Sequence, residues 1–186
     1  LSHTTEEVMP ALASLNVEIY KTRAGKSSDY PLKATHEDYT IKYLTDSPLT
    51  EVLKNNFLDL SPAHIACLID KSIPSPDDFF IDGGLDYRPI LSQLVSGELD
   101  CDRMDYLERD SYYTGTNYGK FDRDWVIVNM TTHAVDDRLY LALNRRALYT
   151  FDDFMISRHH IHSMVYFHHK CLVYEEMLNR YLTAKD

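Results

Sequence analysis

The chain has little glycine, proline or cysteine, and each shortage excludes a class of protein. Glycine and proline number 6 and 7 among 186 residues, so long stretches lack turn residues and a mainly helical protein is indicated. The 3 cysteines are too few and too scattered for a disulfide framework or a zinc knot, which favours a reducing, cytoplasmic compartment. No run of eighteen apolar residues occurs and no signal peptide is visible, so we expect no membrane association.

Positive charge is also scarce. The 19 lysines and arginines face 29 aspartates and glutamates, which gives a formal net charge of −10. Binding to nucleic acid depends mostly on neutralising phosphates with Lys and Arg, so a general nucleic-acid surface is disfavoured. A small anionic substrate stays compatible, because a local basic pocket or a bound metal can outweigh the net charge.

Helix signals recur along the chain and outnumber strand signals. Ser61-Pro62, for example, combines a capping residue with a proline suited to the first helical position. The expected helices cover residues 1–15, 35–46, 48–55, 61–71, 88–96, 100–113 and 122–128, followed by one or two long helices over 148–184. The sequence has one hairpin candidate, around an Asp136-Asp137 turn, while residues 16–34 and 72–86 read as loops. We therefore predict a mainly α fold with at most a small β-hairpin, built as one domain over residues 1–186.

The most informative segment is residues 99–110, which is acidic and aromatic. A helix turns by about 100° per residue, so Asp102, Tyr106 and Asp110 share one face within about 80°. Arg103 lies almost in register with Asp110, seven residues on. Carboxylates, a phenol and a guanidinium on one face suit a hard cation together with a phosphorylated substrate. The face therefore predicts a metal-assisted phosphate site.

A plainer interpretation of the same helix is a solvated surface with ion pairs at i,i+4, such as Asp105 with Arg109. Two observations argue against it. Met104 and Leu107 stand among the charges, which indicates that the helix is partly buried. The many carboxylates also repel one another unless something positive lies between them.

A second informative segment, residues 157–170, holds five of the nine histidines. Arg158, His162, Tyr166 and His169 lie on one helix face within about 80°. Zinc is disfavoured here, because no two histidines stand four apart and no glutamate lies between them. One Arg, a His and a Tyr suit a polyphosphate instead. The alternative is a surface cluster of histidines without a ligand.

Both helices resemble the HD-domain metal-dependent phosphohydrolases, close to those that remove triphosphate from deoxynucleoside triphosphates. The first carries Leu-Asp-x-Asp-Arg-Met-Asp-Tyr-Leu-x-Arg-Asp, followed by Ser-Tyr-Tyr-Thr-Gly and Gly-Lys-Phe-Asp. The second carries Arg-x-x-x-His-x-x-Val-Tyr-x-His-x-Lys. The resemblance implies an HD-domain helical bundle, a divalent metal (Mg, Mn, Fe or Zn), a nucleotide or other phosphorylated substrate, and a homo-oligomer.

The resemblance also implies a role for each matched residue. The position of Asp102 is a metal ligand in this family, and the position of Arg103 contacts phosphates. Tyr106 and Asp110 match positions that hold the sugar and its 3′-hydroxyl. The positions that line the nucleotide pocket match Arg158, His162 and Tyr166, and Lys170 is implied as a further phosphate contact.

The front of the chain resembles the family less completely. Thr35-His36-Glu37 resembles the start of a family helix whose His sits beside the catalytic centre, which makes His36 the candidate for proton transfer; a surface capping residue is the alternative. The His…His-Asp ligands of the family do not occur in the chain. We therefore expect the N-terminal portion of the domain to be absent from this chain, and the chain alone to be inactive.

Three other functions stay open from the residues alone. The first is an HD phosphohydrolase that acts on another nucleotide or phosphoester, and it would release a different product. The second is a catalytically silent nucleotide-binding module that keeps the pocket. The third is a helical interaction protein, which requires both motif matches to be accidental.

Overall fold

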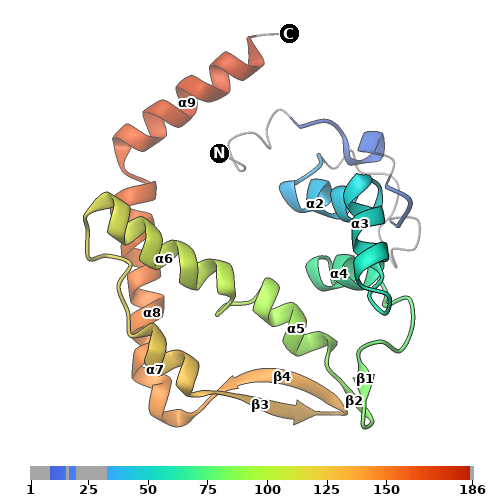
Figure 1. Ribbon diagram of the computed structural model, residues 1–186. Helices are drawn as coiled ribbons and strands as arrows, with labels where there is room; N and C mark the ends of the chain where they lie inside the picture. Colours follow the sequence, from blue (N-terminus) through green and yellow to red (C-terminus); the bar gives the residue numbers. More distant parts are fainter. Residues whose placement is uncertain (1–8, 16, 20–32, 185–186) are drawn as a thin grey trace. The chain divides into compact units, whose positions relative to one another are not determined.

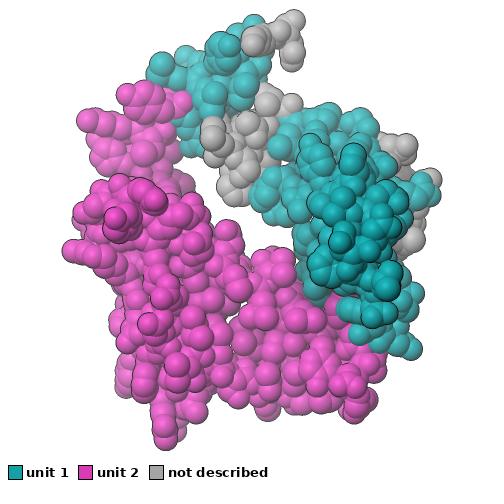
Figure 2. Space-filling model, in the orientation of Figure 1, with its two compact units in different colours: residues 1–79, 175–186 teal, residues 80–174 magenta. Residues whose placement is uncertain are grey.

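Figure 1 shows the computed structural model of the chain, which describes residues 9–15, 17–19 and 33–184. Most of the helix expected over 1–15 and of the loop expected over 16–34 lies outside these residues. Within them, Leu12–Leu15 forms a short 3-10 helix, η1. The chain divides into two compact units, residues 1–79 with 175–186 and residues 80–174 (Figure 2). One domain over 1–186 stays a prediction.

In the described part of the first unit, three short helices have starts that are set by capping side chains. They are α2 (His36–Thr45), α3 (Pro48–Asn56) and α4 (Pro62–Ile69). Each begins with a reciprocal capping box: Thr35 with Asp38, Ser47 with Thr50, and Ser61 with His64. Such a box satisfies backbone N–H groups that the first turn leaves without helical partners. The helices predicted here are confirmed, with ends displaced by one or two residues.

The second unit follows the same logic with longer helices and a small sheet. Its elements are β1 (Ile81–Asp82), β2 (Leu85–Asp86), α5 (Arg88–Val95), α6 (Cys101–Thr114), α7 (Arg123–Val128), β3 (Met130–Val135), β4 (Arg138–Leu143), η3 (Arg145–Ala147), α8 (Leu148–Ile161), the π-helical segment η4 (His162–Tyr166) and the start of α9 (His169–Thr183). The fold is therefore mainly α, as the sequence predicted. No helix in the described part of the chain has the length and apolar character to cross a membrane.

The sheet is larger than the single small hairpin that the sequence predicted. The predicted hairpin is there, with β3 antiparallel to β4 and both turn residues, Asp136 and Asp137, at positive φ. The strand order is β1-β2-β4-β3, and β2 runs parallel to β4. The prediction missed β1 and β2 because each is only two residues long and lies in the segment read as a loop. Gly83 and Gly84 turn the chain between them at φ 56° and 80°, a conformation that glycine adopts without strain.

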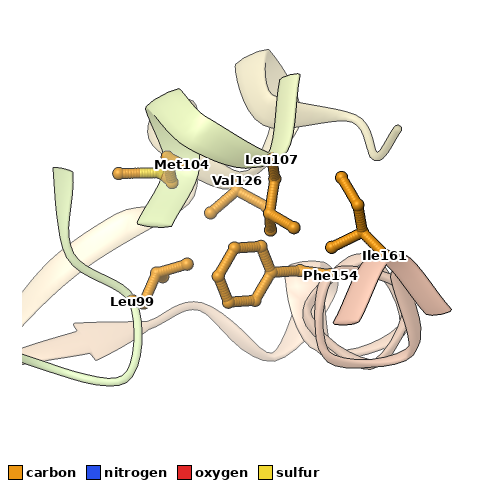
Figure 3. Close-up of a cluster of buried hydrophobic side chains, with 6 residues drawn as sticks. All are labelled: Leu99, Met104, Leu107, Val126, Phe154 and Ile161. Atoms are coloured by element: carbon orange, nitrogen blue, oxygen red, sulfur yellow. The ribbon is translucent and has the colours of Figure 1, made fainter. Parts of the chain in front are cut away.

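The core of this unit joins α6, α7 and α8 around Phe154. Figure 3 shows the six buried side chains, which are Leu99, Met104, Leu107, Val126, Phe154 and Ile161. Gly119 lies so close to α6 that a Cβ there would be 2.2 Å from the carbonyl oxygen of Leu107. The hydroxyl of Ser157 donates to the carbonyl oxygen of Lys120 at 2.8 Å. The 115–122 connection is thereby held against both α6 and α8, which places these two helices side by side (Figure 1).

Candidate functional site

The first turn of α6 is positioned by a buried aspartate. Asp100 caps the helix, and its Oδ1 accepts from the backbone N–H of Arg103 at 2.7 Å. Its Oδ2 accepts from the backbone N–H of Gly97 at 3.2 Å. A carboxylate at a helix N-terminus is stabilised by the helix dipole and by these N–H groups. The carboxylate of Asp100 therefore holds the backbone on both sides of residue 98.

Two tyrosines, a histidine and an aspartate come together where α6 meets η4. The hydroxyl of Tyr166 donates to Oδ2 of Asp110 at 2.5 Å. The ring of Tyr106 makes edge contacts with His162 and Tyr166 at centroid distances of 6.4 and 6.2 Å. The rings of His162 and Tyr166 stand 4.9 Å apart and nearly perpendicular. Aromatic rings favour such edge-to-face contacts, so the four side chains support one another.

His162 and Tyr166 are the first and last residues of the π-helical segment. The backbone N–H of Phe167 donates to the carbonyl oxygen of His162 at 2.8 Å, an i→i+5 bond. A π-helical turn is rare and often lies at a functional site. The sequence predicted helix throughout this stretch, since local patterns do not separate a π turn from an α turn. The segment interrupts the long C-terminal helix and turns both side chains toward α6.

Two arginines converge on one carboxylate oxygen beside this group. Nη1 of Arg103 lies 2.7 Å from Oε2 of Glu98, and Nη1 of Arg158 lies 2.9 Å from the same oxygen. Arg103 also pairs with Asp100, at 3.6 Å. The side chain of Glu98 is 70% exposed, whereas those of the two arginines are 25% and 27% exposed. The guanidiniums are therefore held in place, and an exposed anion bridges them.

The electrostatics of the group follow from burial and from these arginines. Burial raises the pKa of Tyr106, and Arg158 and Arg103 oppose that shift. Burial, then the charges of Arg158 and Arg103, lower the pKa of His162. Burial, then the hydrogen bond to Asp110, raises the pKa of Tyr166. At neutral pH the group therefore contains two neutral phenols, a neutral imidazole and two cations, which suits a sugar joined to phosphate.

Two other predicted site residues of the second unit, Asp102 and Lys170, are not part of this group. Asp102 is exposed in the first turn of α6. Lys170 is exposed in α9, and its backbone N–H donates to Nδ1 of His168 at 3.3 Å. His36 belongs to the first unit, at the first position of α2, where Nε2 lies 3.1 Å from Oε1 of Glu37. The capping residue of this helix is Thr35, and the role of His36 in proton transfer stays a prediction.

The predicted metal centre does not form among the residues that the structure describes. Over 9–15, 17–19 and 33–184, no group of three or more His, Cys, Asp or Glu side chains is placed to hold a metal ion. Asp102 is a hard oxygen ligand suited to such a cation, but one carboxylate alone does not hold it. The described residues therefore supply at most one ligand of the predicted centre.

Two residues of this group, Glu98 and Asp100, were not predicted as site residues from the sequence. A capping signal was available for Asp100, since it directly precedes the helix and its carboxylate can accept from the N–H of Arg103. No local pattern marks Glu98, because one of its two partners lies 60 residues further along the chain. The i,i+4 pair that supported the plainer interpretation is also present, with Asp105 and Arg109 2.7 Å apart on the exposed side of α6.

No family model matches the chain. It is 33% identical over 132 residues to an uncharacterized protein of Mycoplasma pneumoniae, which covers 70% of this chain and 28% of that protein. It is 31% identical over 96 residues to an uncharacterized protein of Methanocaldococcus jannaschii, which covers 52% of this chain and 21% of that protein. The chain thus spans less than a third of the length of these curated relatives.

A solved structure shares the architecture. A hypothetical protein from Aquifex aeolicus superimposes with a TM-score of 0.64 and 26% sequence identity, over 80% of this chain and 37% of that one. The arrangement of helices and sheet described above is therefore found in another protein. None of these names states a function.

Proposed function

We propose that the face formed by α6, α8 and η4 binds a deoxynucleoside triphosphate, within an HD-domain phosphohydrolase that releases a deoxynucleoside and triphosphate. The observation that carries the proposal is the convergence of Arg103 and Arg158 on a single oxygen of Glu98. An oxygen of a phosphate in that position would receive two charge-assisted hydrogen bonds. Arg is well suited to this because its planar guanidinium matches phosphate geometry.

The neighbouring side chains suit the sugar. The carboxylate of Asp110 can accept from a 3′-hydroxyl, and Tyr166 already donates to that carboxylate. The rings of Tyr106 and Tyr166, 6.2 Å apart at their centroids, offer apolar contact to a deoxyribose, and Tyr166 would disfavour a 2′-hydroxyl. His162, kept neutral by burial and by the arginines, can donate or accept beside the sugar. Lys170 is proposed as a further phosphate contact and His36 as the group for proton transfer.

A divalent metal belongs to the same proposal, with Asp102 as one ligand and the others outside the described residues. Such a metal would polarise a phosphate and activate water. Because the described residues do not hold it by themselves, we assign no step of the hydrolysis to it. What these residues contribute is binding and orientation of the substrate.

The test is an assay of the full-length gene product with each deoxynucleoside triphosphate and Mn²⁺ or Mg²⁺. We expect release of triphosphate and loss of activity in Asp102→Ala, since the cation loses a ligand. The matched control is Asp105→Ala, which removes a carboxylate from the same helix on its exposed side. Full activity of Asp102→Ala contradicts the metal assignment. Orthophosphate as the product indicates another phosphohydrolase, and tight binding without turnover indicates the silent nucleotide-binding module.

A further inference from the structure

We propose that Glu98 is an internal competitor for the two guanidiniums: it occupies both in the free protein, so a phosphate group binds there only by displacing the Glu98 carboxylate. We call the contact of Glu98 with Arg103 and Arg158 the Glu98 bridge. The inference rests on the proposed function only in that it takes these two arginines as the phosphate-binding groups. The carboxylate of Glu98 occupies the position that a phosphate oxygen must take, at 2.7 and 2.9 Å from the two Nη1 atoms.

The backbone on both sides of Glu98 is held, so the side chain alone must move. Gly97 packs against the end of α5, where an added Cβ would lie 2.4 Å from the carbonyl oxygen of Gln93. Its N–H donates to the buried carboxylate of Asp100, two residues after Glu98. Leaving the bridge therefore requires only rotation of the Glu98 side chain, without rearrangement of the loop.

The release of Glu98 from the two arginines carries little desolvation cost. Its side chain is 70% exposed while it makes the bridge, so the displaced carboxylate passes into water and no buried charge is created. The hydrogen bond from Arg158 and the charge of Arg103 also lower the pKa of Glu98. The bridge is therefore ionised at neutral pH, and an incoming anion always competes with it.

The competition favours anions that bring more than one phosphate. A single phosphate exchanges one pair of charge-assisted hydrogen bonds for another and gains little. It also stands near Asp100, which pairs with Arg103 at 3.6 Å and cannot leave because it caps α6. A polyphosphate can place one charged phosphate on each guanidinium, so its attraction exceeds that of the single carboxylate. Glu98 therefore weakens the binding of every phosphate ligand by the same factor, and a polyphosphate has the stronger attraction needed to displace it.

The first test compares inorganic tripolyphosphate with orthophosphate in metal-free titration calorimetry. We expect Glu98→Gln to tighten the binding of both anions by about tenfold, which is about 1.4 kcal/mol, because both must displace the same carboxylate. The control is Glu108→Gln, because Glu108 on α6 pairs with Arg123 on α7 at 2.6 Å and neither is part of the bridge. Unchanged Kd values in Glu98→Gln overturn the inference, as does failure of both proteins to bind tripolyphosphate.

The second test needs no phosphate ligand and no turnover. Phenylglyoxal reacts with accessible guanidiniums, and peptide mapping gives the rate at each arginine. Compared with wild type, Glu98→Gln is expected to react several-fold faster at Arg103 and Arg158 and at the same rate at Arg123. Unchanged rates at Arg103 and Arg158 overturn the inference. If these effects appear but no deoxynucleoside triphosphate is hydrolysed, the proposed function fails and the inference stands. If deoxynucleoside triphosphates are hydrolysed but Glu98→Gln changes neither tripolyphosphate affinity nor arginine reactivity, the proposed function stands and the inference fails.

Discussion

The hydroxyl of Tyr166 donates to the carboxylate of Asp110 at 2.5 Å, across 56 residues of sequence. This bond joins the π-helical segment to α6 beside the two guanidiniums. It also orients an acceptor that the proposed function assigns to the sugar. The bond therefore contributes both to the packing of η4 against α6 and to the shape of the proposed binding face.

Tyr166→Phe removes the donor and keeps the ring. We expect a loss of about 1 kcal/mol in the free energy of unfolding, since a partly exposed hydrogen bond to a charged group is lost. We also expect weaker binding of a deoxynucleoside triphosphate. Urea denaturation measures the first effect, with Tyr149→Phe as the control because Tyr149 is 81% exposed. Equal midpoints for wild type and Tyr166→Phe would contradict the prediction.

The pKa of His162, lowered by burial and by Arg158 and Arg103, makes stability depend on pH. Above the ordinary histidine pKa of 6.5 both folded and unfolded states are neutral at this residue. As pH falls below that value, the unfolded state takes up the proton before the folded state does. The free energy of unfolding therefore decreases until the pH reaches the lowered pKa of the folded state. We therefore expect the difference in unfolding free energy between wild type and His162→Gln to shrink between about pH 7.5 and pH 5.

The measurement is urea denaturation of both proteins across that range. His133→Gln is a suitable control, because His133 is exposed on β3 and is not part of the group around His162. A difference between wild type and His162→Gln that is constant with pH would show that His162 does not titrate differently in the two states.

Phe154→Ala removes the centre of the core between α6, α7 and α8. Phe154 is fully buried and its ring lies 5.0 Å from that of Phe121. A loss of about 3–5 kcal/mol in unfolding free energy is expected, because both the transfer of the ring and the cavity left behind contribute. Met155→Ala, at the next position and 37% exposed, should cost much less. Similar losses in the two variants would place the core elsewhere.

Arg158→Lys keeps the charge of the second arginine and removes its planar fork. Because a lysine ammonium cannot reproduce the guanidinium geometry, tripolyphosphate binding should weaken about tenfold. Calorimetry measures this, and Arg123→Lys is the matched control, since Arg123 pairs with Glu108 and Asp124. Equal weakening in both variants would indicate a general charge effect and remove Arg158 from the binding face.

The sequence predicted a good part of the local structure. The helix starts at Thr35 and Ser61, the helix over Asp102 and Asp110, and the Asp136-Asp137 turn all depend on neighbours a few residues away. The helical period also placed Tyr106 with Asp110, and His162 with Tyr166, correctly on shared faces. These features are set by backbone hydrogen bonding and side-chain spacing, which a short window of sequence contains.

Tertiary structure alone decided which of these faces meet. The π turn at 162–166 and the joining of β2 to β4 leave no local pattern. Glu98 reaches Arg158 across 60 residues because packing around Phe154 brings α8 beside the start of α6. Long-range contacts of this kind depend on the shape of the whole core, so no period or motif predicts them. The sequence therefore determined the elements and the chemistry on each helix, and the packing of α6 against α8 determined the binding face.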